Sequence, residues 1–377
     1  MASIRLENIT KKFKNTTAVN NISLMIADGE FFCILGPPGA GKTTLLRIIV
    51  GLEKPDEGSV IIGDDAVNEI HPSKRDISMI FQNLALYPDK TVFENIAFPL
   101  RQQKIEDEEI EKRVVEVAKH LKIDWLFEKI PSQLSGGERQ RVAIGRAIVR
   151  QPKAYLMDEP LSNLDALLRL EMRVALKELQ TNLKETFVYV THDQVEALSM
   201  GDRIAVLNQG KLQQVDDPAT IYRMPNNMFV ATILGNPPMN FLKCLLRRKN
   251  GTLQIEHAAF TLNSEDKKVF SLLKAGGSAA GVVLGFRPED IKIHLSKPGT
   301  VSIPAEIYVT EPLGSETIVD IKLGDNVIKV LAPPDFVGEP GQSVWITANT
   351  HKLHLFDESS HECVFHATEK SAFTIEA

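Results

Sequence analysis

The sequence predicts an α/β domain built on a parallel sheet, followed by a smaller all-β domain. The chain has 377 residues, which is more than one typical domain contains. Up to about residue 235, apolar runs typical of buried parallel strands alternate with segments that have helical spacing. Beyond residues 235–238 (Gly-Asn-Pro-Pro), short alternating runs separated by turns dominate, which favours a small barrel or sandwich. We therefore expect domains at residues 1–235 and 236–377.

A phosphate loop is predicted at residues 36–43, which fit the pattern G-x-x-x-x-G-K-[ST] at every fixed position. A strand-like run at 30–35 precedes the loop, and an apolar helix at 44–50 follows it. Glycines let successive N–H groups point at phosphate oxygens, and the helix N-terminus adds its positive dipole end. Lys42 would reach the β- and γ-phosphates, and the Thr43 hydroxyl would ligate Mg²⁺. The alternative is a glycine-rich turn without a ligand, and the strand, helix, lysine and threonine together argue against it. The nucleotide-binding residues expected here are Gly36, Pro37, Pro38, Gly39, Ala40, Gly41, Lys42, Thr43 and Thr44.

Two adjacent carboxylates end a second apolar run, at residues 154–157. A strand that delivers Asp158 and Glu159 to its C-terminal edge places them where open α/β sheets bind ligands. Asp158 suits the water shell of Mg²⁺, and Glu159 suits a general base that takes a proton from attacking water. A solvated acidic turn before Pro160 is the alternative, which the phosphate loop upstream disfavours.

Residues 134–140, Leu-Ser-Gly-Gly-Glu-Arg-Gln, lie between the phosphate loop and the acidic strand end. In this order the three elements resemble the ATP-binding subunit of an ATP-binding cassette transporter, whose signature LSGGQ is LSGGE here. The resemblance implies a P-loop NTPase cassette that binds ATP and Mg²⁺ and has a helical subdomain at about residues 83–150. Residues 105–121, where apolar positions recur at helical spacing, would form an amphipathic helix of that subdomain.

The resemblance also assigns three residues outside these motifs. Gln82 is similar to the glutamine of the family's Q-loop, which senses Mg²⁺ and the γ-phosphate, and so counts as a catalytic and metal-site residue. His192 is similar to the switch histidine that contacts the γ-phosphate. Asp165 ends residues 162–165, which resemble the D-loop that crosses between two subunits. Polar caps at strand ends are the alternative for the glutamine and the histidine.

The signature predicts a dimer. Ser135, Gly136 and Gly137 precede a helix expected at 138–150, so a hydroxyl and bare amides form a second anion site. In the family, the signature of one subunit closes on ATP held by the P-loop of the other, which implies a two-fold homodimer. A simple N-cap with a glycine pair is the alternative. Glu138 departs from the consensus glutamine. Phe13 stands where the family stacks Tyr or Trp on adenine, and it keeps the π-face.

Composition and charge exclude some other classes. The net charge is −6 without a basic stripe, so no nucleic-acid partner is expected. Three widely spaced cysteines, Cys33, Cys244 and Cys363, show no disulfide or metal-ligand logic, which fits a reducing cytoplasm. We see no N-terminal signal, and no apolar run approaches the roughly 20 residues needed to cross a bilayer. We therefore expect a peripheral protein on the cytoplasmic face of the cell membrane.

The second domain resembles that of the maltose-type sugar importer ATPases at residues 227–231, 238–242, 285–290 and 311–316. In that group the region is an OB-like (TOBE) regulatory domain that helps to hold the dimer together. Strands are expected at 241–247, 252–256, 282–286, 305–310, 317–323, 326–331 and 343–348, with a hairpin turn at 250–251. The fold alone assigns no ligand to this domain, and the tail from about residue 357 predicts nothing specific.

The resemblance implies an ATPase that energises uptake of a sugar or related solute, such as an oligosaccharide, a polyol or glycerol phosphate. Its expected partners are two transmembrane permease subunits and an extracytoplasmic solute-binding protein. Residues 83–87 would line the cleft that receives a permease coupling helix, although a plain surface loop fits them equally well without the family. Alternatives are an importer of polyamines or inorganic ions, and a soluble cassette ATPase acting on nucleic acid or ribosomes. The β-domain could also bind a regulator.

Overall fold

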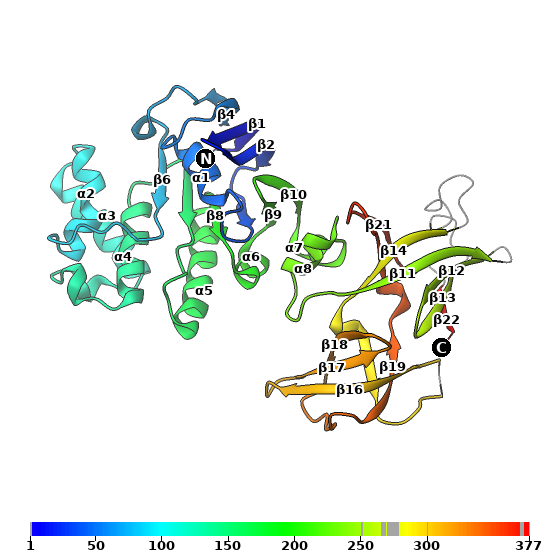
Figure 1. Ribbon diagram of the computed structural model, residues 1–377. Coiled ribbons are helices and arrows are strands. Elements are labelled where there is room, and N and C mark those ends of the chain that lie inside the picture. The colour runs from blue at the N-terminus through cyan, green and yellow to red at the C-terminus, as the bar shows by residue number, and fades with distance from the viewer. Residues whose placement is uncertain are drawn as a thin grey trace. The chain divides into compact units, whose positions relative to one another are not determined.

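The computed structural model describes residues 2–249, 252–264, 269, 279–299, 301–369 and 373–376. The chain divides into two compact units, Met1–Ile221 and Tyr222–Ala377 (Figure 1). The division falls within the short helix α7 (Pro218–Arg223), ahead of the boundary predicted between residues 235 and 236, which stays a prediction. No helix of the described part is both long and apolar enough to span a membrane.

The first unit contains the predicted parallel sheet. Its strand order is β10-β9-β3-β8-β7-β6, and the pairs among β9, β3, β8, β7 and β6 are parallel, whereas β10 is antiparallel to β9. Every residue of β3, β7 and β8 is buried, as continuous apolar runs require in a sheet covered on both faces. The strands are β3 (Phe31–Leu35), β6 (Ile77–Ile80), β7 (Ala154–Asp158), β8 (Thr186–Thr191), β9 (Arg203–Asn208) and β10 (Lys211–Asp216).

An antiparallel sheet, which the α/β alternation did not predict, completes this unit. Its order is β2-β1-β4-β5, formed by β1 (Ile4–Phe13), β2 (Thr16–Ile26), β4 (Glu57–Ile62) and β5 (Asp65–Ala66). Register shifts interrupt the pairing of β1 with β2, so a simple alternation of apolar and polar residues is lost in the sequence. Buried side chains of this sheet, including Ile4, Leu6 and Val60, join one core with the parallel sheet.

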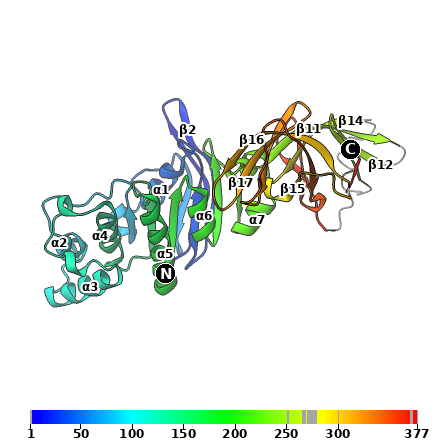
Figure 2. The ribbon, with the colours of Figure 1, turned by 90° about the horizontal axis from the view of Figure 1, so that it is seen from below.

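Helices cover the parallel sheet and form a separate group. Helix α1 (Lys42–Val50) shares the core of the sheet, and α5 (Ala166–Leu183) and α6 (Gln194–Met200) follow β7 and β8. Helices α2 (Val92–Gln102), α3 (Asp107–His120) and α4 (Gly136–Ile148) lie together at one end of the unit in both views (Figures 1 and 2). The amphipathic helix predicted at 105–121 corresponds to α3, which buries Ile110, Val114 and Ala118.

The second unit is all-β apart from short helical segments such as α8 (Met228–Ile233), as predicted. Its two sheets have the orders β21-β20-β14-β11-β12-β13-β22 and β15-β19-β16-β17-β18, and their buried side chains form one core. The seven predicted strands are β11 (Asn240–Lys249), β12 (Thr252–His257), β14 (Ala279–Phe286), β16 (Ile303–Pro312), β17 (Thr317–Leu323), β18 (Asn326–Ala332) and β19 (Ser343–Ala348).

Five strands of this unit were not predicted: β13 (Phe260–Ser264), β15 (Ile291–His294), β20 (His354–Asp357), β21 (Cys363–His366) and β22 (Phe373–Glu376). Each has only four or five residues, too few to show a clear alternation. The hairpin turn expected at 250–251 lies outside the described residues, while Lys249 pairs with Thr252 at the ends of its two strands.

A buried arginine holds the helical segments of the second unit to its strands. The Arg287 guanidinium donates hydrogen bonds to the carbonyl oxygens of Ala231, Leu234 and Tyr222. It also lies 4.0 Å from the centre of the Tyr222 ring, and burial lowers its pKa. The Tyr222 hydroxyl in turn donates to Glu289 at 2.6 Å. These contacts give a structural role to the motif at 285–290.

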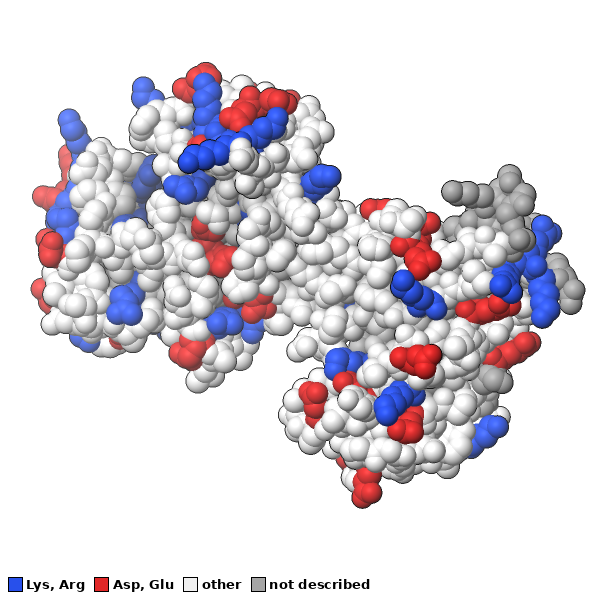
Figure 3. Space-filling model, viewed as in Figure 1, with Lys and Arg blue, Asp and Glu red and all other residues white. Residues whose placement is uncertain are grey.

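Charged side chains of both signs are interspersed on the face of the molecule shown in Figure 3.

Candidate functional site

The predicted phosphate loop lies between β3 and α1. Gly39 and Gly41 have φ angles of 78° and 99°, a region that favours glycine. A Cβ on Gly41 would lie 2.2 Å from the carbonyl oxygen of Ala18, so no larger residue fits there. Gly41 is also the N-cap of α1 and has no side chain to cap the first turn. The amides of that turn therefore meet the requirement for an anion site.

One pocket gathers the loop and its surroundings. It is lined by residues 38–44, by Glu159, and by residues that the sequence analysis missed: Thr16, Thr17, Ala18 and Gln209. The missed residues come from the start of β2 and from the turn after β9. Gln209 follows β9, which pairs with β3 beside the loop, whereas β2 belongs to the separate antiparallel sheet. These residues carry no motif of their own, so the sequence did not identify them.

Lys42 points its ammonium group into the loop. Its Nζ donates to the carbonyl oxygens of Gly36 at 2.8 Å and Pro37 at 3.1 Å, and lies 3.3 Å from a carboxylate oxygen of Glu159. Only 4% of the side chain is exposed. The positive charge is therefore desolvated and held where the loop amides converge, which strengthens its attraction for a phosphate group.

The three residues predicted for a metal site line one further pocket. Thr43 Oγ1 donates to Asp158 Oδ1 at 2.9 Å, and Gln82 lies in the lining of the same pocket. Burial raises the pKa of Asp158, while the Thr43 hydroxyl and Lys42 act in the opposite direction. Arg47, which was not predicted, and Asn163 of the predicted D-loop also line this pocket. Hydroxyl, carboxylate and amide oxygens are ligands that suit a hard divalent cation.

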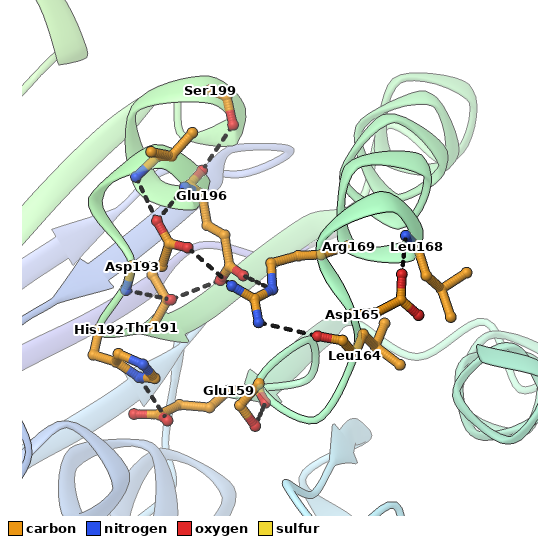
Figure 4. A network of polar contacts seen from close by, with 12 residues as sticks. Glu159, Leu164, Asp165, Leu168, Arg169, Thr191, His192, Asp193, Glu196 and Ser199 are labelled. Atoms are coloured by element: carbon orange, nitrogen blue, oxygen red, sulfur yellow. Dashed lines mark hydrogen bonds and ion pairs between the residues drawn. The ribbon is translucent and has the colours of Figure 1, made fainter. Parts of the chain in front are cut away.

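Glu159 and His192 meet across two strand ends (Figure 4). Glu159 follows β7 with a φ of 45°, an unusual conformation for a non-glycine residue, and its N–H donates to the Val190 carbonyl at 2.9 Å. His192 follows β8, and its Nδ1 lies 2.9 Å from Glu159 Oε2. The two carboxylate oxygens of Glu159 thus face different cations, Lys42 and the imidazole when it is protonated.

The signature segment forms the start of α4. Ser135 is the N-cap: its Oγ accepts from the N–H of Glu138 at 3.3 Å, and Glu138 Oε2 accepts from the N–H of Ser135 at 2.6 Å. This reciprocal pair is a capping box. The hydrogen bond from the Ser135 backbone holds the pKa of Glu138 below its usual value. Glu138, which stands where the family consensus has glutamine, therefore caps the helix together with Ser135.

The glycines of the signature lie against the next helix. A Cβ on Gly136 would lie 3.8 Å from the Leu164 side chain, and one on Gly137 would lie 2.3 Å from the Leu168 side chain. Asp165 caps α5, because its Oδ1 accepts from the Leu168 N–H at 3.0 Å. The signature and the predicted D-loop are therefore neighbours within one chain.

The adenine, signature and D-loop residues predicted for the nucleotide site do not line the phosphate pocket of their own chain. Within residues 2–249, all of which the structure describes, the lining of that pocket does not include Phe13, Ser135, Gly136, Gly137 or Asp165. Phe13 pairs with Thr16, which does line the pocket, and its side chain is 42% exposed. The separation of the signature from the loop of its own chain is what a site shared between two subunits requires.

A groove borders the segment after Gln82. Ala85 and Tyr87 line it together with Phe98 and Arg146. The Arg146 guanidinium donates to the carbonyl oxygens of Leu84 at 2.7 Å and Ala85 at 2.6 Å, and lies 5.5 Å from the centre of the Tyr87 ring. Arg146 belongs to α4, so the helix that begins at the signature also holds the groove.

Comparisons with known proteins match both units. The family profile described as ABC transporter matches residues 19–162, the one described as MalK OB fold domain matches 235–291, and the one described as TOBE domain matches 284–356. The trehalose/maltose import ATP-binding protein MalK of Thermococcus litoralis is 44% identical over 375 residues, covering 97% of this chain and 100% of that protein. The oligosaccharides import ATP-binding protein MsmX of Bacillus subtilis is 43% identical, covering 96% of this chain and 99% of that protein.

Two further comparisons bear on the solute and on the assembly. The sn-glycerol-3-phosphate import ATP-binding protein UgpC of Psychromonas ingrahamii is 43% identical, covering 95% of this chain and 94% of that protein. Among solved structures, a dimeric post-hydrolysis state of the ATP-binding cassette MJ0796 with ADP and phosphate is similar with a TM-score of 0.53 and 36% identity. That similarity covers 57% of this chain and 98% of MJ0796.

Proposed function

The chain belongs to the ATP-binding subunits of ATP-binding cassette transporters, and from this membership we propose that it hydrolyses ATP to energise uptake of a sugar or related solute. The observation that carries the proposal is that Glu159, which lines the pocket of the phosphate loop, contacts Lys42 through one carboxylate oxygen and His192 through the other. Relatives that this chain covers over 94–100% of their length are named as import ATP-binding proteins for trehalose and maltose, oligosaccharides or sn-glycerol 3-phosphate.

The geometry supports a division of roles in hydrolysis. Glu159 would take a proton from the attacking water, a step typically worth about 10²–10⁴ in rate, and its contact with His192 supports this role. His192, whose Nδ1 lies 2.9 Å from Glu159 Oε2, would orient that carboxylate and would contact the terminal phosphate. Lys42 would exchange its bonds to the Gly36 and Pro37 carbonyls for bonds to phosphate oxygens.

The residues present fit a magnesium ion. Thr43 Oγ1 and Asp158 Oδ1 are already 2.9 Å apart, and Gln82 lines the same pocket, so all three could hold the cation or its water shell. When bound, Mg²⁺ would neutralise charge on the phosphates as they separate.

We infer that a homodimer completes the site. Ser135, Gly136 and Gly137 present a capped helix N-terminus that lies outside the phosphate pocket of the same chain. The signature of a second copy, with Asp165 beside it, would close on the nucleotide, and Phe13 would stack on adenine. The dimeric ADP- and phosphate-bound cassette, 36% identical to this chain, supports this arrangement.

Transport requires partners. We propose that two transmembrane permease subunits bind the chain on the cytoplasmic face of the membrane, through the groove lined by Ala85, Tyr87 and Phe98. An extracytoplasmic solute-binding protein would deliver the solute. The second unit, which matches MalK OB fold and TOBE domains, would act as the regulatory domain.

Affinity purification from gently solubilised native membranes, followed by mass spectrometry, tests the proposal. We expect two hydrophobic permease subunits and a solute-binding protein, whose bound sugar or sugar-like solute would identify the cargo. Recovery of a polyamine or inorganic-ion binding protein would overturn the assigned solute. Recovery with ribosomes or DNA and without a permease would overturn the importer.

A matched pair of variants sharpens this experiment. Tyr87→Glu places a charge in the groove and should lose the permease while retaining ATP binding. Tyr308→Glu alters another exposed tyrosine, in the second unit, and should retain the permease. Equal recovery of permease with both variants would rule out the groove as the docking surface.

A further inference from the structure

Arg169, which belongs to no motif of the sequence analysis, links two functional segments (Figure 4). It lies in the first turns of α5, directly after the predicted D-loop. Its Nη2 donates to the Leu164 carbonyl at 3.1 Å, and its backbone N–H donates to the Asp165 carbonyl at 2.9 Å. The guanidinium is therefore fixed to the D-loop by one end of its fork.

The other side of the fork faces two carboxylates that follow His192. Arg169 Nη1 lies 3.6 Å from Asp193 Oδ2, and its Nε lies 4.0 Å from Glu196 Oε1. These are ion-pair distances rather than hydrogen bonds. Among the described residues, the buried Nε has no hydrogen-bond partner. Arg169 is therefore only loosely paired with Asp193 and Glu196, and a small movement of its guanidinium toward them would form hydrogen bonds.

Glu196 fixes the residues on both sides of His192. Its Oε2 accepts from the Thr191 hydroxyl at 2.6 Å, and that hydroxyl oxygen accepts from the Asp193 N–H at 2.9 Å. The Tyr189 hydroxyl donates to the same carboxylate oxygen at 2.9 Å. Only 3% of Glu196 is exposed, and burial raises its pKa against the effect of these hydroxyls. Arg169 is its nearest cation, so its position bears directly on this carboxylate.

We propose that Arg169 is a positioning residue that couples the D-loop to His192. When a second copy engages the D-loop, displacement of the Leu164 carbonyl moves the guanidinium against Asp193 and Glu196. The tightened fork then fixes the segment that holds His192 beside Glu159. The inference rests on the proposed ATPase function and adds a reason why hydrolysis waits for the dimer.

The ATPase kinetics of the full chain test this coupling. In Arg169→Met, kcat should fall about tenfold, because a displaced catalytic group loses rate rather than affinity. The KM for ATP should stay within about twofold, because Arg169 does not line the phosphate pocket. Arg169→Lys should recover only part of the loss, because one ammonium cannot replace a fork that serves both sides.

Two controls separate positioning from general damage. Arg173→Met removes the same side chain one turn further along α5, and should leave both kcat and KM unchanged. Thermal unfolding of each variant shows whether lost activity follows lost stability. Equal kcat in Arg169→Met and Arg173→Met would overturn the inference, as would a rise in KM at constant kcat.

A double-mutant cycle tests whether Arg169 acts on His192 through Glu196. Glu196→Gln keeps an acceptor for the two hydroxyls but removes the charge that faces Arg169. Because both changes break one link, the double variant should have a kcat within about twofold of the slower single variant. Multiplied losses would contradict a shared path. The ATPase activity of Glu159→Gln, measured in the same assay, separates the two hypotheses. If Glu159→Gln retains turnover, the proposed function is wrong. If Glu159→Gln loses turnover while Arg169→Met keeps the wild-type kcat, only the coupling through Arg169 is wrong.

Discussion

At the scale of single residues, Glu138 shows how a departure from a family consensus is accommodated. A carboxylate near a phosphate site would repel the ligand if it pointed toward it. Instead, Oε2 accepts the Ser135 N–H at 2.6 Å, which directs the charge back along the helix start. The Ser135 hydroxyl completes the capping box. A glutamine has an acceptor oxygen in the same place, so either residue supports this cap.

The pKa of Glu138 makes this role testable by pH. Because the folded-state pKa is lower than the ordinary 4.5, the carboxylate stabilises the fold above that value. The contribution is lost as the pH falls through the folded-state pKa. At pH 7, Glu138→Gln should lower the free energy of unfolding by less than about 1 kcal/mol, because Glu138 is only partly buried and glutamine keeps an acceptor oxygen for the Ser135 N–H.

Urea unfolding of the wild type and Glu138→Gln at several pH values checks this expectation. The difference in the free energy of unfolding between the two proteins should become smaller as the solution is acidified. Their kcat values at pH 7 should be similar. A difference that grows on acidification would contradict the direction of the pKa shift. A large loss of kcat would show that the charge itself acts in the site.

At the scale of elements, the phosphate loop depends on where its glycines sit. Gly39 and Gly41 both have positive φ, but their surroundings differ. A Cβ on Gly39 would meet no atom within 4 Å, whereas one on Gly41 would lie 2.2 Å from the Ala18 carbonyl oxygen. The β2 backbone therefore packs closely against the loop at Gly41 and leaves space beside Gly39.

Alanine at these two positions separates backbone strain from steric clash. Gly39→Ala carries only the cost of positive φ, roughly 1–2 kcal/mol. Gly41→Ala should be less stable than Gly39→Ala by at least about 1 kcal/mol, because the loop and β2 must also move apart. Equilibrium unfolding and fluorescent-nucleotide binding measure both effects. Equal stability, with equal affinity for nucleotide, would show that the loop does not depend on this contact.

The sequence predicts contiguous features of these elements better than distant contacts. Strands β3, β7 and β8 are continuous apolar runs, and the loop from Gly36 to Thr43 is a single motif, so both could be placed. Residues 3–7, around the start of β1, alternate and look like a strand, but bulges break the alternation beyond them, so the hairpin of β1 with β2 was not predicted. Arg169 was missed for a related reason. Its partners Asp193 and Glu196 are distant in sequence and become neighbours only when β8 lies beside β7.

At the scale of the whole molecule, the proposed homodimer makes the site described in one chain half of a composite site. The phosphate loop, the proposed base Glu159 and His192 lie together, with Lys42 Nζ at 3.3 Å and His192 Nδ1 at 2.9 Å from Glu159. The signature residues lie outside that pocket. ATP should therefore act as the bridge between two copies, and hydrolysis should remove it.

Light scattering and phosphate release, measured on one sample of Glu159→Gln, show whether ATP bridges two copies and whether Glu159 is needed for hydrolysis. With Mg²⁺ and ATP, this variant should become a stable dimer and release almost no phosphate. Wild type should turn over and dimerise only transiently. Lys42→Ala should remain monomeric, because it loses the cation that faces the phosphates. A Glu159→Gln protein that hydrolyses ATP at near the wild-type rate, or that binds ATP without dimerising, would contradict the account.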